Sequence, residues 1–60
     1  MKTSELIKLL KENGCDLVEH GKEHDKYYSP VTRVYFRVPR HKKEIATGTL
    51  NRILKDAGLK

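Results

Sequence analysis

The sequence predicts an α+β fold with the element order αβββα, in which both helices cover one face of a three-stranded antiparallel sheet. Two observations lead to this prediction. Apolar residues recur at helical spacing near both ends of the chain, and the spacing changes to a period of two between them. The chain has 60 residues, so we expect residues 1–60 to form a single domain.

The first helix is predicted at residues 4–13. Thr3 and Ser4 are N-cap candidates, and Glu5 would place a negative charge at the positive end of the helix dipole. Gly14 supplies the stop signal, because glycine adopts the left-handed conformation at a helix end without strain. The apolar side chains at helical spacing are Leu6, Ile7, Leu9 and Leu10.

The second helix is predicted at residues 48–57. Gly48 and Thr49 open this segment, and Gly58 closes it as a glycine closes the first helix. Apolar residues separated by three or four positions define its buried face. They are Leu50, Ile53, Leu54 and Ala57.

Three strands are predicted between the helices, at residues 15–20, 24–28 and 33–38. The third strand is the clearest, because apolar and polar side chains alternate along it. Pro39 ends this strand, since proline cannot donate a hydrogen bond to a neighbouring strand. Turn-forming residues separate the strands at 20–23 and 29–32.

The loop at residues 29–32 predicts how the second and third strands pair. The apolar residues of the third strand that we expect to be buried are Val34, Phe36 and Val38. Tyr27 then packs inward against Val34, and the alternate residues lie on the open face of the sheet, away from the helices. A slip of one residue would invert these faces. The pairs predicted on the open face are Tyr28 with Arg33, Lys26 with Tyr35, and His24 with Arg37.

Positive charge is concentrated in the middle of the chain. The 13 Lys and Arg residues outnumber the 8 Asp and Glu residues, which gives a net charge of +5. Residues 21–43 hold this whole excess, because their only acids are Glu23 and Asp25. A basic segment of this kind is typical of a protein that binds a polyanion, such as nucleic acid. The alternative interpretation is a solvated surface that keeps a small protein soluble.

The predicted open face combines side chains that suit RNA cleavage. Histidine exchanges a proton near neutral pH, arginine and lysine stabilise charge on a phosphorus centre, and tyrosine rings stack on unpaired bases. RNA cleavage needs a proton taken from the ribose 2′-hydroxyl, a proton given to the leaving 5′-oxygen, and stabilisation of the phosphorane. None of these requires a metal. The face therefore indicates a slow ribonuclease, and the alternative is that His24 lies beside basic residues incidentally.

Other kinds of site and location are less well supported by the sequence. Cys15 has no cationic neighbour that would activate its thiol, and a single cysteine makes no internal disulfide, which fits a cytoplasmic protein. No apolar run reaches the roughly 20 residues of a membrane span, and the first residues lack the apolar stretch of a signal peptide. A zinc site is not indicated either, because the possible ligands do not have the spacing that zinc sites use. These possible ligands are Cys15, His20, His24 and His41.

Four segments together match the pattern of a known family. The opening segment is SELIKLL with Asn13-Gly14, and residues 21–28 read GKEHDKYY. Val38-Pro39-Arg40-His41 follows, and the C-terminal segment, residues 48–59, reads GTLNRILKDAGL. In these segments, which span nearly the whole chain, the protein resembles the HicA toxins of bacterial HicAB toxin–antitoxin systems.

The resemblance implies a compact fold like that of double-stranded-RNA-binding domains. It also implies a type II toxin that cleaves messenger RNA as a metal-independent endoribonuclease, without a cofactor. In the family the catalytic residue is a histidine shortly after a glycine, at the start of the second strand, and His24 matches it, three residues after Gly21. The family often has a serine or threonine hydroxyl there, where this chain has Lys22 and Glu23. The family partner is a HicB antitoxin, which covers the active face of the toxin.

The central positive charge and the predicted open face indicate that the candidate site extends beyond His24. Two other functions stay open. A non-catalytic module of the same fold would bind double-stranded RNA by its shape and phosphates, although it has no use for a titrating group at His24. A protein that only bridges partners through its helices would not need the central positive charge.

Under the ribonuclease hypothesis, RNA contacts are expected from the basic and aromatic residues of the candidate site. These residues are Lys22, Lys26, Tyr28, Arg33, Tyr35, Arg37 and Arg40.

Overall fold

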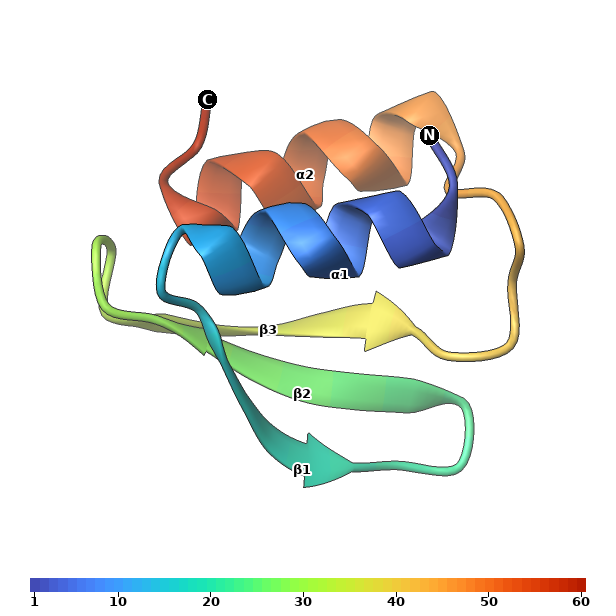
Figure 1. The fold of residues 1–60 in the computed structure, drawn as a ribbon, viewed down its shortest axis with the longest axis horizontal. Helices are drawn as coiled ribbons and strands as arrows, with labels where there is room; N and C mark the ends of the chain where they lie inside the picture. Colours follow the sequence, from blue (N-terminus) through green and yellow to red (C-terminus); the bar gives the residue numbers. More distant parts are fainter.

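The predicted order of helices and strands is confirmed by a computed structural model that describes residues 1–60. Two helices lie side by side on one face of a three-stranded antiparallel sheet (Figure 1). No helix is long and apolar enough to cross a membrane. The elements are α1 (Thr3–Glu12), β1 (Asp16–His20), β2 (His24–Ser29), β3 (Val34–Pro39) and α2 (Thr47–Ala57).

The strands lie in the sheet in the order in which they occur in the chain, β1-β2-β3. β1 lies farthest from the helices (Figure 1), and every one of its residues is exposed. Its pairing with β2 is interrupted by a β-bulge between Leu17 and Glu19. β2 is therefore the central strand, and β3 is the edge strand next to α2.

The core forms between the helices and the helix-facing side of β2 and β3. Leu6 and Leu10 of α1 are fully buried there, and Tyr27 and Phe36 stack with their ring centroids 6.1 Å apart. Cys15 is also buried, as a packed side chain just before β1. The nine buried apolar residues are Leu6, Leu10, Cys15, Tyr27, Phe36, Val38, Ile45, Ile53 and Ala57.

The predicted register of β2 and β3 was wrong by two residues. The turn occupies residues 30–33, because Arg33 adopts the left-handed conformation (φ 61°) and its N–H donates to the Ser29 carbonyl oxygen at 2.8 Å. Arg33 thus belongs to the turn and not to the strand. Because side chains alternate with a period of two, this shift leaves the other residues on their predicted faces. The observed pairs are His24 with Pro39, Lys26 with Arg37, Tyr27 with Phe36, Tyr28 with Tyr35, and Ser29 with Val34.

Val34 is a second correction, because it was expected to be buried and is 40% exposed. It lies at the turn end of the hairpin, opposite Ser29. That end is fastened to α2 by polar contacts instead. The Ser29 hydroxyl donates to the Ala57 carbonyl oxygen at 2.7 Å, and the Thr32 hydroxyl donates to the Asp56 carbonyl oxygen. These bonds tie the C-terminal end of α2 to the turn end of the β2–β3 hairpin.

The helix ends also differ slightly from the prediction. Neither Thr3 nor Ser4 caps α1, since Lys2 is the N-cap residue and makes no side-chain cap hydrogen bond. The Thr3 hydroxyl donates instead to the Lys42 carbonyl oxygen, which ties the start of α1 to the loop between β3 and α2. α2 ends as predicted, with Gly58 in the left-handed conformation (φ 80°).

Candidate functional site

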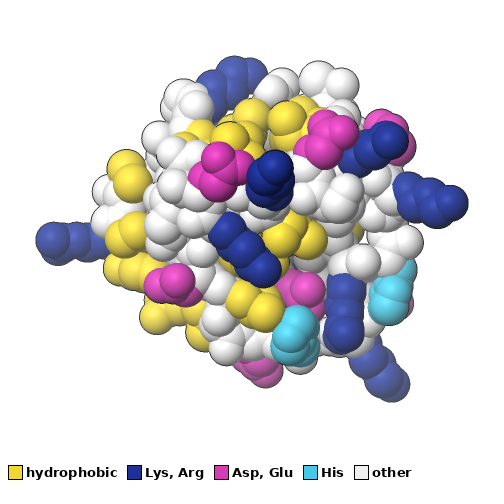
Figure 2. Space-filling view, viewed as in Figure 1, with side chains coloured by type: hydrophobic (Ala, Val, Ile, Leu, Met, Phe, Trp, Pro, Cys, Tyr) yellow, Lys and Arg dark blue, Asp and Glu magenta, His cyan; other side chains and the backbone are white.

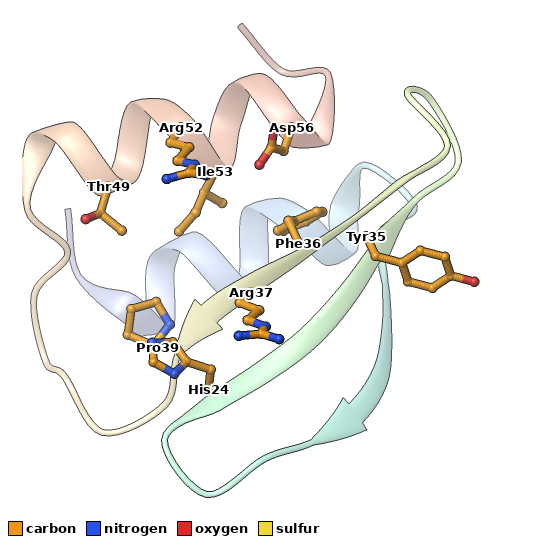
Figure 3. A pocket seen from close by; sticks show the side chains of 9 residues that line it. All are labelled: His24, Tyr35, Phe36, Arg37, Pro39, Thr49, Arg52, Ile53 and Asp56. Carbon is orange, nitrogen blue, oxygen red and sulfur yellow. The ribbon is translucent and has the colours of Figure 1, made fainter.

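His24 is the first residue of β2, and its exposed side chain lines two adjoining hollows. The first, the sheet hollow, lies on the open face and has a volume of about 380 Å³. Its lining residues are Glu19, Gly21, Lys22, Glu23, His24, Lys26 and Arg37. The second, the β3–α2 cleft, has a volume of about 480 Å³ (Figure 3). It is lined by His24, Tyr35, Phe36, Arg37, Pro39, Thr49, Arg52, Ile53 and Asp56.

The turn that precedes His24 is held by residues that follow β3. The backbone N–H of Arg40 donates to the Glu23 carbonyl oxygen at 2.8 Å, and its guanidinium donates to the Gly21 carbonyl oxygen at 2.8 Å. The His41 ring nitrogen Nε2 lies 2.8 Å from the Lys22 carbonyl oxygen. Three successive carbonyl groups of the turn are thereby satisfied, so the backbone before His24 has a fixed position.

Asp25 follows His24 directly, but its side chain belongs to the helix-facing side of the sheet and is 8% exposed. Its Oδ1 atom lies 3.1 Å from Nδ1 of His20 and 3.9 Å from Nε of Arg40. The Asp25 carboxylate is thus engaged on the face of the sheet opposite to His24. Burial, and secondly the nearby negative charge of Asp25, raise the pKa of Tyr27 above its usual value of 10.0.

The basic side chains around His24 form no ion pairs. Lys26 and Arg37 face each other across the β2–β3 ladder, and neither they nor Lys22 form an ion pair. Lys26 Nζ lies 4.9 Å from the ring centroid of Tyr35, a cation–π contact. Figure 2 shows basic and histidine side chains next to one another near the β1–β2 turn. The sheet hollow is also lined by the acids Glu19 and Glu23, so its three cations leave a smaller positive excess, which favours an anion.

The structure brings together only part of the predicted site. Lys22, Lys26 and Arg37 share the sheet hollow with His24. Tyr35 borders the β3–α2 cleft, although its ring points away from it (Figure 3). That ring packs on the half-buried ring of Tyr28, with a centroid distance of 4.8 Å.

Two predicted residues lie elsewhere. Arg33 was placed on the open face opposite Tyr28, but it is in the turn at the other end of the hairpin from His24. Arg40 was expected to contact RNA. Its guanidinium instead contacts the Gly21 carbonyl oxygen and the Asp25 carboxylate, so it holds the turn.

Sequence reasoning missed the contribution of α2. Thr49, Arg52 and Asp56 form the helical wall of the β3–α2 cleft (Figure 3). Their spacing of three and four residues places them on one helical face, which was an available signal. It could not be interpreted without knowing which face of α2 lies beside β3.

The arrangement combines a proton-transfer group with cations in an open, accessible site. An imidazole can take or give a proton, and guanidinium and ammonium groups can bind an anionic phosphate and stabilise added negative charge. The structure contains no group of three or more His, Cys, Asp or Glu side chains arranged to hold a metal ion.

The sequence of the chain matches a known protein family. A family model described as "HicA toxin of bacterial toxin-antitoxin" matches residues 3–59, which is nearly the whole chain. No individual protein with a curated description matches the chain.

Proposed function

The chain belongs to the HicA toxin family of toxin–antitoxin systems, and from this premise we propose that it is an endoribonuclease that cleaves messenger RNA with His24 as the catalytic residue. The reaction needs no metal ion and no cofactor in this proposal. A HicB-like antitoxin neutralises the enzyme by covering the face that carries His24. Toxin, substrate and antitoxin meet in the cytoplasm.

One observation carries the proposal: His24 and Arg37 each line both hollows. A phosphodiester bound where the hollows meet would lie within reach of an imidazole and of a guanidinium at the same point. Lys22 and Lys26, in the sheet hollow, add positive charge for a neighbouring phosphate.

The chemistry follows from these positions. The ribose 2′-hydroxyl loses its proton, its oxygen forms a bond to phosphorus, and the bond from phosphorus to the 5′-oxygen breaks. The leaving 5′-oxygen takes up a proton, so the products are a 2′,3′-cyclic phosphate and a 5′-hydroxyl. His24 exchanges one of these two protons and solvent water exchanges the other, and Arg37 stabilises the phosphorane charge.

The test uses the wild-type chain and the variants His24→Ala and His24→Gln, each incubated with a long RNA in EDTA. His20→Gln is the matched control, because His20 lines neither hollow. We expect the wild type and His20→Gln to cleave the RNA, and both His24 variants to leave it intact. Equal fragments from the His24 variants would remove His24 from the mechanism.

A binding-only module of the same fold would give a different result. It would bind RNA in a salt-sensitive manner and leave it intact even in the wild-type form. The toxin role is tested by expression in bacterial cells, where the wild type should arrest growth and His24→Gln should not. Co-expression of a HicB-like antitoxin should restore growth.

A further inference from the structure

We propose that the β3–α2 cleft receives one unpaired nucleotide of the RNA, next to the phosphate bound at His24. The substrate is then single-stranded RNA, and α2 supplies part of its binding site. This inference rests on the proposed function for the cleavage step, whereas the binding site itself can be tested without cleavage.

The cleft has the composition of a site for a small organic group. Phe36 and Ile53 form an apolar floor and are 5% and 3% exposed, with the half-buried Pro39 beside His24. Polar side chains form the rim. The volume of about 480 Å³ lies within the range of roughly 300–1,000 Å³ that is usual for ligand pockets. An apolar floor with a polar rim suits a base and a ribose.

Charge gives the nucleotide a direction in the cleft. Arg52 projects from α2 toward the sheet, whereas His24 and Arg37 approach from β2 and β3 (Figure 3). Neither arginine is in an ion pair, so both are free to bind phosphate oxygens. Asp56 is the only carboxylate that lines the cleft, and it lies at the end away from His24 (Figure 3). It repels a phosphate there and can accept a hydrogen bond from a base N–H.

The shape of the cleft favours an unpaired nucleotide over a duplex. In a duplex each base is stacked on both sides and its pairing edge is occupied, so a base cannot enter a hollow in the protein surface. The cleft shares His24 and Arg37 with the sheet hollow. A single strand can therefore pass from the sheet hollow over His24 and place its next nucleotide against α2.

The first experiment compares strandedness. The probe is a fluorescein-labelled RNA oligonucleotide without self-complementarity, either alone or annealed to its complement, and the protein is His24→Ala, which does not cleave it under the proposed function. Fluorescence anisotropy should show the single strand bound about ten-fold or more tightly than the duplex. Equal or tighter binding of the duplex would overturn the inference.

The second experiment tests α2. Arg52→Ala removes the cation that α2 contributes to the cleft, and Lys55→Ala removes one from an exposed position of the same helix outside the cleft. Thr49→Glu places a carboxylate in the cleft, and Thr47→Glu places one in the same helical turn outside it. All four variants are made in the His24→Ala background. We expect the two cleft variants to bind the single strand about ten-fold more weakly than their controls.

Equal affinity of each cleft variant and its control would overturn the inference. Circular dichroism melting curves confirm that the variants fold, and both glutamates lie in the first helical turn, where negative charge favours the helix. The two proposals fail separately. If His24 is essential for cleavage but Arg52 and Thr49 do not affect binding, the proposed function stands and the cleft inference fails. If single-strand binding depends on the cleft but cleavage does not depend on His24, the cleft inference stands and the proposed function fails.

Discussion

Gly21 and His24 are in close backbone contact: a Cβ atom added to Gly21 would lie 2.2 Å from the carbonyl oxygen of His24. No β-carbon fits at that distance, so either residue would have to move to accommodate a side chain. The turn cannot yield easily, because hydrogen bonds from Arg40 and His41 hold its carbonyl groups. The close contact therefore couples the identity of residue 21 to the position of the candidate catalytic histidine.

Replacement of this glycine should damage both stability and activity. We expect Gly21→Ala to lower the free energy of unfolding by about 1–3 kcal/mol, the usual cost of overpacking, and to reduce RNA cleavage. Gly48→Ala is the control, because a Cβ there meets nothing within 4 Å and Gly48 lies in α2. It should stabilise the protein by about 0.5–1 kcal/mol. Urea unfolding measures the stability of both variants. A Gly21→Ala variant as stable as the wild type would contradict the close contact.

Arg40 should act by positioning the turn rather than by binding RNA. Arg40→Ala leaves the Gly21 carbonyl group without its side-chain donor and removes a cation from near the Asp25 carboxylate. We expect a loss of about 0.5–1.5 kcal/mol in unfolding free energy and a lower kcat with little change in KM. Lys43→Ala removes an exposed cation from the same loop and should change neither quantity. A rise in KM alone would mean that Arg40 binds RNA.

Charge reversal separates the observed strand register from the predicted one. Arg37→Glu places a negative charge beside His24 in both hollows, whereas Arg33→Glu makes the same change in the turn at the far end of the hairpin. We expect Arg37→Glu to weaken RNA binding about ten-fold or more and Arg33→Glu to have a much smaller effect. Salt titration of the binding constant checks this. Equal losses would mean that RNA covers the whole hairpin.

Tyr27 should make the protein less stable in alkali. Its pKa is raised by burial and by Asp25, so the folded protein holds the phenolic proton more tightly than the unfolded chain does. The stability linked to this proton is complete below the unfolded pKa of about 10 and is lost as the pH rises beyond it. The unfolding free energy should therefore fall more steeply above about pH 10 for the wild type than for Tyr27→Phe. Tyr35→Phe, at an exposed ring, should retain the wild-type slope.

Local patterns were sufficient to predict the elements of this fold. The helical spacing of Leu6 and Leu10, and of Ile53 and Ala57, corresponds to the buried faces of α1 and α2. The left-handed conformation of Gly58 ends α2, as its sequence predicted. These features depend on neighbouring residues only, so a single sequence contains the information.

The strand register and the helical wall of the cleft depend on contacts that a local pattern does not encode. A shift of two residues preserves the alternation of faces, so the pattern could not distinguish the pair Lys26–Arg37 from the pair Lys26–Tyr35. The left-handed conformation of Arg33 decided between them, and arginine is not a residue that signals this conformation. Arg52 joined the site only because α2 packs beside β3.

The arrangement of the strands in chain order has a consequence for how quickly the protein can form. Each strand pairs only with its neighbour along the chain, across short turns, so the sheet closes small loops. Topologies of this kind fold faster than sheets built from distant segments. His24 and the turn before it belong to the hairpin of β1 and β2, whereas Arg37, Arg40 and His41 lie on or after β3. The candidate catalytic centre should therefore be complete only when the hairpin of β2 and β3 has also formed.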